Sequence, residues 1–178
     1  MPLDIGVGIL LSLGVAEYFG AEVTPFLIAF GIVCALLPDI DVITFPLLGK
    51  WYHRTHTHYP ILYLPLAILA YIFFDPLYAT IFTLGVYAHL IHDTFGLGWG
   101  IAWLWPVTGR KFLIFPWKGA PGQKGMLATW MPENEPSLMQ KQQDTGWVKR
   151  YYFRPNPLAF IEYGIFVIAL ALLVLHFS

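Results

Sequence analysis

The stretch that decides the fold class is Pro157-Leu-Ala-Phe-Ile-Glu-Tyr-Gly-Ile-Phe-Val-Ile-Ala-Leu-Ala-Leu-Leu-Val-Leu-His-Phe177, which is almost entirely apolar. It reaches the roughly 20 residues that an α-helix needs to cross the hydrocarbon core of a bilayer. Pro157 suits the first turn of such a helix, because the N–H that proline lacks would have no helical partner there. The stretch therefore predicts a membrane-spanning helix.

The composition of the chain points to the same surroundings. Of the 178 residues, 57% are hydrophobic and only 12% are charged, whereas about 25% of residues are charged in soluble domains. So few charges cannot cover a soluble globule of this size, and the length favours a single membrane domain over residues 1–178. A net charge of -1 without a basic face argues against a nucleic-acid partner. The single cysteine, Cys34, excludes an internal disulfide and a zinc cluster built on cysteines.

Four shorter apolar segments precede the last one, and Pro25, Pro60 and Pro76 lie at or near the starts of three of them. We therefore expect an all-α integral membrane protein with about five transmembrane helices. A short strand or extended stretch is expected at 111–116, within a long 92–156 connection whose part from about 107 to 156 forms a cytosolic flap. The expected helices cover residues 5–19, 23–37, 60–74, 76–91 and 157–177.

The positive charges predict the orientation in the membrane. All ten lysines and arginines fall in the 38–59 and 92–156 connections, and the short connections around Glu22 and Asp75 contain none. Because basic residues concentrate in cytoplasmic loops, we expect a multi-pass protein of the cell inner (plasma) membrane. Its N-terminus is expected in the cytoplasm and its C-terminus outside.

Two carboxylates follow the second apolar segment, in Leu36-Leu-Pro-Asp-Ile-Asp41. Pro38 disfavours the helical conformation at Leu37, so the helix is predicted to end there. In an extended segment residues two apart point to the same side, and Asp39 and Asp41 would then converge. The alternative interpretation is a solvated helix end.

A group of three histidines follows, in His53-Arg-Thr-His-Thr-His58. His53 and His56 would share a helical face, and His56 and His58 would share a strand face, so the spacing leaves the ligand pair open. The alternative interpretation is a basic loop at the membrane interface.

A third group ends the fourth apolar segment, in Tyr87-Ala-His-Leu-Ile-His-Asp93. His89, His92 and Asp93 would lie on one helical face, and the alternative here is a hydrogen-bonded helix end. By the expected topology all three groups reach the cytoplasmic face. Imidazole and carboxylate ligands suit zinc, manganese or iron, and two metal ions suit displacement at a phosphoryl group.

The motifs also resemble, in order and spacing, a family of membrane-bound, metal-dependent hydrolases, described too as LexA-regulated inner-membrane hydrolases. The resemblance covers most of residues 30–112 and extends distantly to zinc phospholipase C and P1 nuclease. Val86 separates Gly85 from Tyr87, which are adjacent in the family, and Asp4 stands where many members carry a histidine. The motifs that match are Leu37-Pro-Asp-Ile-Asp41, His53 through His58, Gly85 through Asp93, and Leu104-Trp-Pro106.

The resemblance implies a set of metal ligands and leaves His56 and His92 as unmatched extras. The expected cofactor is a divalent metal, zinc first with manganese and iron as alternatives, in one to three ions. The implied metal ligands are Asp39, Asp41, His53, His58, His89 and Asp93.

The leading functional hypothesis is a membrane-embedded hydrolase that acts on a phosphoester in a lipid or lipid-linked substrate. We expect Asp41, His58 and Arg54 to be catalytic, and Arg54, with Arg110 as a weaker candidate, to bind the phosphate through paired hydrogen bonds. The expected partner is a membrane lipid or lipid-linked phosphate, and an oligomer stays open.

Two other functions compete with hydrolysis. A structural metal would pin the loops and present the cytosolic flap to a partner, and a closed set of protein ligands would distinguish it from a catalytic site. A carrier of metal ions or protons would need ionisable residues along the membrane depth. The only candidates, Glu17, Glu162 and His176, are expected towards the outer ends or halves of their helices.

Overall fold

The computed structural model describes residues 2–41, 56–96, 100–116, 126–131 and 153–178. The regular secondary structure of the described part is α-helical apart from short 3-10 turns and one small hairpin, which confirms the all-α prediction. The helices begin and end close to the predicted residues. They are α1 (Pro2–Phe19), α2 (Pro25–Leu36), α4 (Pro60–Phe73), α5 (Pro76–His92) and α8 (Pro157–Phe177).

A proline and a polar residue before it fix the starts of three helices. The side chains of Thr24, Asp75 and Asn156 accept hydrogen bonds from backbone N–H groups in the first turns of α2, α5 and α8. These side chains satisfy amide groups that a helix leaves without an internal partner. The turn chemistry between apolar segments therefore explains why their boundaries could be read from the sequence.

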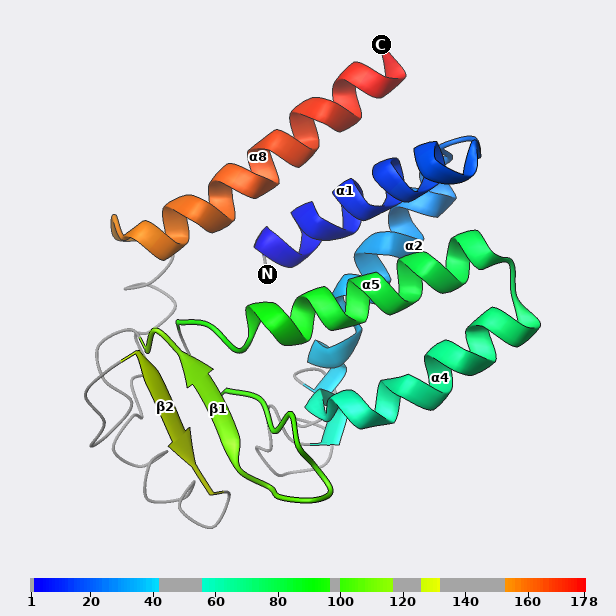
Figure 1. The fold of residues 1–178 in the computed structure, drawn as a ribbon. Coiled ribbons are helices and arrows are strands. Elements are labelled where there is room, and N and C mark those ends of the chain that lie inside the picture. The colour runs from blue at the N-terminus through cyan, green and yellow to red at the C-terminus, as the bar shows by residue number, and fades with distance from the viewer. Residues whose placement is uncertain (1, 42–55, 97–99, 117–125, 132–152) are drawn as a thin grey trace.

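Successive helices along the chain run in opposite directions, so α1, α4 and α8 run one way and α2 and α5 the other. Figure 1 shows α8, α1, α5 and α4 side by side in that order, with α2 behind them, and α1 contacts α2, α5 and α8. As a result, the N-terminal ends of α1, α4 and α8 and the C-terminal ends of α2 and α5 lie at one end of the molecule (Figure 1). The C-terminus of the chain lies at the opposite end (Figure 1). One end of each of the five helices therefore lies on the same side of the molecule.

Small residues permit the close contact between α1 and α2. A Cβ added at Gly8 would lie 2.6 Å from the Cα atom of Ile32 and 2.7 Å from the carbonyl oxygen of Gly31. The hydroxyl of Ser12 lies in the same contact, 2.9 Å from the Gly8 carbonyl oxygen and 3.0 Å from that of Leu27. Such small and hydroxyl side chains are typical of helix contacts in membranes.

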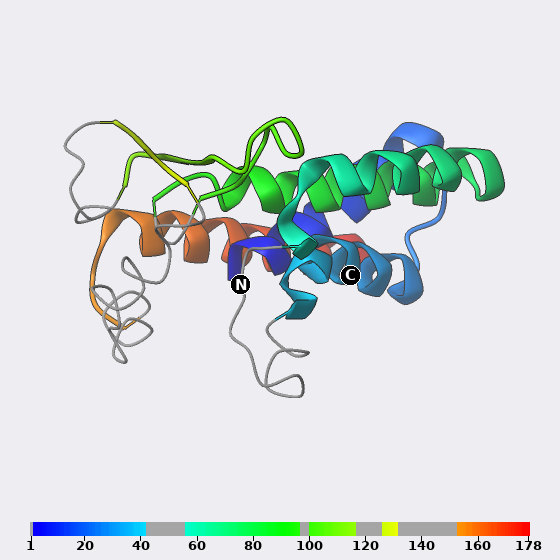
Figure 2. The ribbon, with the colours of Figure 1, turned by 90° about the horizontal axis from the view of Figure 1, so that it is seen from below.

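A hairpin covers the end of the molecule where α5 stops. Strands β1 (Lys111–Ile114) and β2 (Leu127–Trp130) pair antiparallel, and Figure 2 shows the hairpin from a second direction. The expected strand at 111–116 is confirmed, whereas β2 lies in the stretch expected as a flap and was not predicted. Backbone hydrogen bonds from Ile114 to Thr94 and from Gly96 to Ile114, of 2.6 Å and 2.9 Å, join β1 to the chain after α5. With only four residues, β2 is too short for the alternation of apolar and polar residues to predict a strand.

Helix length supports fewer membrane spans than the five expected. Only α1 and α8, among the described helices, are long and apolar enough to cross a membrane by length and composition. The expected segments of about 15 residues became helices of 12 and 14 residues in α2 and α4, and α5 has 17. They are short because proline and polar residues stop them on both sides. In the most apolar 18-residue stretch of α8, only 17% is buried within the protein.

Candidate metal centre

The helical path after α2 differs from the predicted one. Leu37 keeps helical backbone angles, φ -57° and ψ -40°, and a 3-10 turn over Leu37–Asp39 continues the helix. Ile40 is also in the helical region, so the expected extended segment at Asp39 and Asp41 is wrong. Proline disfavours but does not forbid a helical residue before it, and Pro38 occupies the start of the new turn.

The two carboxylates nevertheless meet at one imidazole. His58 Nε2 lies 3.5 Å from Asp39 Oδ1, and His58 Nδ1 lies 3.3 Å from Asp41 Oδ2. Side chains two apart on a helical path diverge, and the ring of His58 contacts one of them through each of its nitrogens. Convergence therefore comes from the position of His58 and not from an extended backbone.

The turn before α4 holds His58 in this position. His58 ends a 3-10 turn over His56–His58. The hydroxyl of Tyr63 donates to the carbonyl oxygen of Thr57 at 2.7 Å, and the hydroxyl of Tyr87 on α5 donates to that of Pro60 at 3.0 Å. The first bond ties the turn to α4, and the second ties the start of α4, directly after the turn, to α5.

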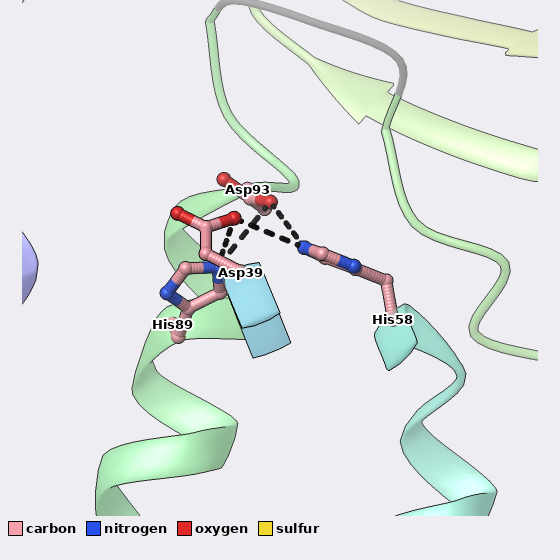
Figure 3. A group of neighbouring side chains, drawn as sticks. All are labelled: Asp39, His58, His89 and Asp93. Atoms are coloured by element: carbon pink, nitrogen blue, oxygen red, sulfur yellow. Dashed lines mark ion pairs between the residues drawn. The ribbon is translucent and has the colours of Figure 1, made fainter. Parts of the chain in front are cut away.

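The last turn of α5 supplies the other two members of the cluster. Asp93 Oδ2 lies 3.3 Å from His58 Nε2 and 3.6 Å from His89 Nε2, and Asp39 Oδ1 lies 3.5 Å from His89 Nε2. One atom from each of these four side chains lies within 4.8 Å of all the others, as Figure 3 shows. Asp39, His58, His89 and Asp93 together are called the ligand cluster below, and they could bind a metal ion.

The spacing of the ligand cluster fits a small divalent ion. Nitrogen and oxygen ligands about 2.0–2.1 Å from a tetrahedral zinc lie about 3.3–3.4 Å apart. The four nitrogen–oxygen distances in the cluster run from 3.3 to 3.6 Å. These four nitrogen–oxygen distances are therefore close to those of such a coordination shell, and every pair of the four ligand atoms lies within 4.8 Å.

The orientation of His89 is that of a metal ligand. Its Nδ1 lies 2.8 Å from the carbonyl oxygen of Ala35, and a carbonyl oxygen can only accept, so Nδ1 carries the proton. Its Nε2 has no hydrogen-bond partner among the described residues and faces Asp39 and Asp93. A histidine that donates from one nitrogen and leaves the other for a metal is the usual arrangement in metalloproteins.

The electrostatics of the ligand cluster also call for a cation. Burial lowers the pKa of His58, but hydrogen bonds to the carboxylates of Asp39, Asp41 and Asp93 outweigh it and raise the pKa to about 9. The imidazole ring is 1% exposed, so water does little to screen these charges. Without a metal, the surrounding carboxylates favour the protonated, positively charged form of His58. A divalent cation bound among them would supply that positive charge instead.

Asp41 lies behind the ligand cluster. Its Oδ2 accepts a hydrogen bond of 2.9 Å from the hydroxyl of Thr57 and lies on the Nδ1 side of His58. The Nε2 atom of the same ring faces Asp39 and Asp93. The expected metal ligand Asp41 is therefore placed where a carboxylate orients a ligand histidine.

None of the other predicted site residues is placed in the ligand cluster among the described residues. His53 and Arg54 are outside the described residues. His56 is exposed and its ring contacts that of Tyr59, at 5.9 Å between ring centres, so the structure brings His58 and not His56 to the cluster. Arg110 is exposed and donates to the hydroxyl of Thr129 at 3.2 Å across the hairpin.

Aromatic residues of the Leu104-Trp-Pro106 region flank the ligand cluster. The rings of Tyr59 and Trp105 stack with centres 4.6 Å apart and an angle of 4° between their planes. The indole N–H of Trp103 donates to the hydroxyl of Thr94 at 2.8 Å. The two tryptophans thus contact the direct neighbours of His58 and Asp93.

Sequence reasoning named Asp4 and His92 near the site but missed Glu162. Asp4, His92 and Glu162 lie beside the ligand cluster, with Asp4 Oδ1 3.3 Å from His89 Nδ1 and His92 Nε2 3.5 Å from Glu162 Oε1. The expectation that Glu162 lies far from the cluster, towards the outer half of its helix, is wrong. Glu162 is the sixth residue of α8, close to the end that starts beside the site. A lone carboxylate in an apolar helix was the signal that could have found it.

The comparison with known proteins gives one match. A family model described as YdjM inner membrane protein matches residues 4–177. No curated protein and no solved structure gives a significant match. The match includes all four residues of the ligand cluster and supports the predicted inner-membrane location, while the description names no reaction. The chain belongs to the YdjM inner membrane protein family.

Proposed function

We propose that this protein is a metal-dependent hydrolase that cleaves a phosphoester in a lipid or lipid-linked substrate. The observation that carries the proposal is the ligand cluster, in which His89 turns an imidazole nitrogen towards Asp39 and Asp93. A divalent ion bound there supplies positive charge for the phosphoryl group and lowers the pKa of water. Zinc fits the donor set and spacing best, with manganese and iron as alternatives.

The donor set favours a catalytic over a structural metal. Structural zinc sites in proteins are built largely on cysteine, whereas imidazole and carboxylate sets are typical of hydrolytic sites. Cys34, the only cysteine, lies outside the ligand cluster. The side chain of Asp39 is 14% exposed, while those of His58 and His89 are 1% exposed. Asp39 therefore marks the side from which a substrate would approach.

The lengths of the helices favour a lipid substrate. At 1.5 Å per residue, the 14 residues of α4 extend about 21 Å, and the 21 residues of α8 extend about 32 Å. The hydrocarbon core of a bilayer is about 30 Å thick. The helices α2, α4 and α5 are shorter than this core, so their ends beside the ligand cluster would lie at or just below the headgroup level. A site at that depth reaches a headgroup phosphate without removing the lipid from the membrane.

The residues of this chain would divide the work as follows. Asp39, His58, His89 and Asp93 would hold the ion. Asp41 would orient His58 through Nδ1, and Arg54, four residues before His58 in the sequence, would bind the phosphate oxygens through paired hydrogen bonds. A carboxylate or imidazole that does not bind the ion would move the proton.

A structural metal is the second candidate. The observation in its favour is that the ligand cluster offers four protein ligands, of which His58, His89 and Asp93 are almost fully buried. A closed set of four ligands leaves no position for a substrate. In that case the metal would hold the helix ends together and the 107–156 flap would bind a partner.

The proposed orientation places the ligand cluster at the cytoplasmic face. The N-terminal end of α1 lies at the same end of the molecule as the cluster, and the C-terminus lies at the other end (Figure 1). All ten lysines and arginines belong to the two long connections, whose described ends also lie at the cluster end. Positive charge favours the cytoplasm for that end.

The test is turnover by the purified full-length protein in lipid nanodiscs with added zinc or manganese. The substrates are phosphatidate, a prenyl phosphate and a nitrophenyl phosphodiester. We expect one of them to be hydrolysed, and Asp39→Ala and His89→Ala to abolish turnover while the protein remains inserted and helical. His176→Ala, which removes an exposed imidazole at the far end of α8, should retain it. Activity that survives both cluster substitutions would contradict this site. Bound metal without any turnover, together with a lower melting temperature in both variants, would favour the structural role.

A further inference from the structure

We propose that Asp4, His92 and Glu162 form a support network that fixes the orientation of the metal ligand His89. This inference rests on the proposed metal centre and extends it to helices α1 and α8, which contribute nothing to the ligand cluster itself. The three residues act as positioning residues, because each is placed to reach the metal through His89.

Asp4 connects two histidines of α5. Its Oδ1 lies 3.3 Å from Nδ1 of His89 and 3.1 Å from Nδ1 of His92. Nδ1 is the nitrogen of His89 that points away from the ligand cluster, and it is shared between Asp4 and the carbonyl oxygen of Ala35. A carboxylate behind a ligand histidine holds the ring in place and makes it a more basic ligand.

His92 passes the contact on to α8. Its Nδ1 faces Asp4 and its Nε2 lies 3.5 Å from Oε1 of Glu162. The result is a continuous row of alternating carboxylates and imidazoles, from Glu162 through His92 and Asp4 to His89. The row ends at the Nε2 atom that faces the ligand cluster.

The carboxylates of Asp4 and Glu162 are buried, which is evidence for a functional role of the network. Asp4 is 3% exposed and Glu162 is 4% exposed, and Glu162 is the one acidic residue in the 21 residues of α8. Ionisable residues within apolar membrane helices are costly and usually mark a functional site. The close contact of α1 with α8 brings them together, since a Cβ at Gly6 would lie 2.9 Å from the Cα atom of Phe166.

The geometry favours a support network over a second metal site. A metal site needs atoms that converge on one point, whereas His92 contacts Asp4 and Glu162 through opposite sides of its ring. Among the described residues, the one group whose ligand atoms all converge is the ligand cluster. Asp4 also lies on the far side of His89 from that group.

Cobalt(II) gives a direct test, because its visible absorption reports the geometry of its ligands. The full-length protein in nanodiscs would be titrated with cobalt(II) as wild type and as Asp4→Ala, Asp4→Asn and Glu162→Gln. Glu17→Gln, which changes an exposed carboxylate on the same helix as Asp4, is the matched control.

We expect Asp4→Ala to shift the cobalt spectrum and to weaken binding about 10- to 100-fold, as the loss of an outer hydrogen-bond partner usually does. Asp4→Asn keeps an oxygen acceptor for His89 and should recover part of the loss. Glu162→Gln should change the spectrum in the same direction by less, and Glu17→Gln should match wild type. If Asp4→Ala fails to fold, Asp4→Asn and Glu162→Gln still decide the outcome.

An unchanged spectrum and affinity in Asp4→Asn and Glu162→Gln, with only a lower melting temperature, would overturn the support network. Wild-type protein that binds no cobalt would overturn both the metal centre and the network. A third outcome is that wild type binds cobalt and Asp4→Asn alters this binding, yet the wild-type protein hydrolyses none of the substrates. That outcome would overturn the proposed function and leave the support network standing.

Discussion

The Nδ1 atom of His89 lies 2.8 Å from the carbonyl oxygen of Ala35, a residue 54 positions earlier in the chain. This bond joins the last turn of α5 to the last turn of α2. Gly85, one turn before His89, permits the approach, because a Cβ there would lie 3.1 Å from Cβ of Cys34 and 3.2 Å from the backbone nitrogen of Ala35. The packing of two apolar helices therefore decides which nitrogen of His89 faces the ligand cluster.

The first prediction concerns metal content. Protein purified from cells should contain a divalent ion, and His58→Ala or His89→Ala should lose most of it, because each removes a nitrogen from the ligand cluster. Elemental analysis of detergent-solubilised protein measures this. His56→Ala is the matched control, since it removes an exposed imidazole two residues from His58. Equal metal loss in His56→Ala would contradict the choice of His58.

The second prediction separates the two aspartates that follow α2. Asp39→Asn should weaken zinc binding by more than 100-fold, because a charged ligand is lost. Asp41→Asn should weaken it by about 10-fold, the lower end of the range for residues that orient a ligand. Competition with a chelator of known affinity measures both constants. A larger effect for Asp41→Asn would make Asp41 the ligand and reverse their assignment.

The third prediction tests the contact between α1 and α2. Gly8→Ala should destabilise the protein by about 1–3 kcal/mol, because the added Cβ overlaps the backbone of α2. Gly14→Ala on the same helix has nothing within 4 Å of its added Cβ. It should be neutral or stabilising by up to about 1 kcal/mol, since alanine favours helices over glycine. Thermal or denaturant unfolding in detergent compares the two, and equal destabilisation would show that helix packing is not the cause.

The fourth prediction concerns topology. A reporter that is active only outside the cytoplasm should be active when fused after Ser178, because α8 leads away from the end that holds the ligand cluster (Figure 1). A reporter inserted after Gln140, in the connection rich in lysine and arginine, should be active only in the cytoplasm. Signals from the same side for both fusions would contradict the orientation.

Local chemistry made much of the fold predictable. Apolar runs that start at Pro25, Pro60, Pro76 and Pro157 predicted the helices within one or two residues, because capping and proline geometry act over a single turn. The number of membrane spans was less predictable. Segments of similar hydrophobicity ended at different lengths, and only α1 and α8 reached the length of a span.

The amino-acid sequence alone identifies the chemical groups available to the site, a cysteine-free set of aspartates and histidines at the ends of apolar helices. Which of these residues meet depends on how the helices pack. His58 was selected over His56 by a turn that Tyr63 and Tyr87 hold, and Asp41 was moved behind His58 by a helical path where extended backbone was expected. Asp4 and Glu162, 158 residues apart, joined the site because α1 contacts both α5 and α8. Spacing along a chain reports only which residues share a face of one helix, whereas the convergence of ligands depends on how several helices pack against each other.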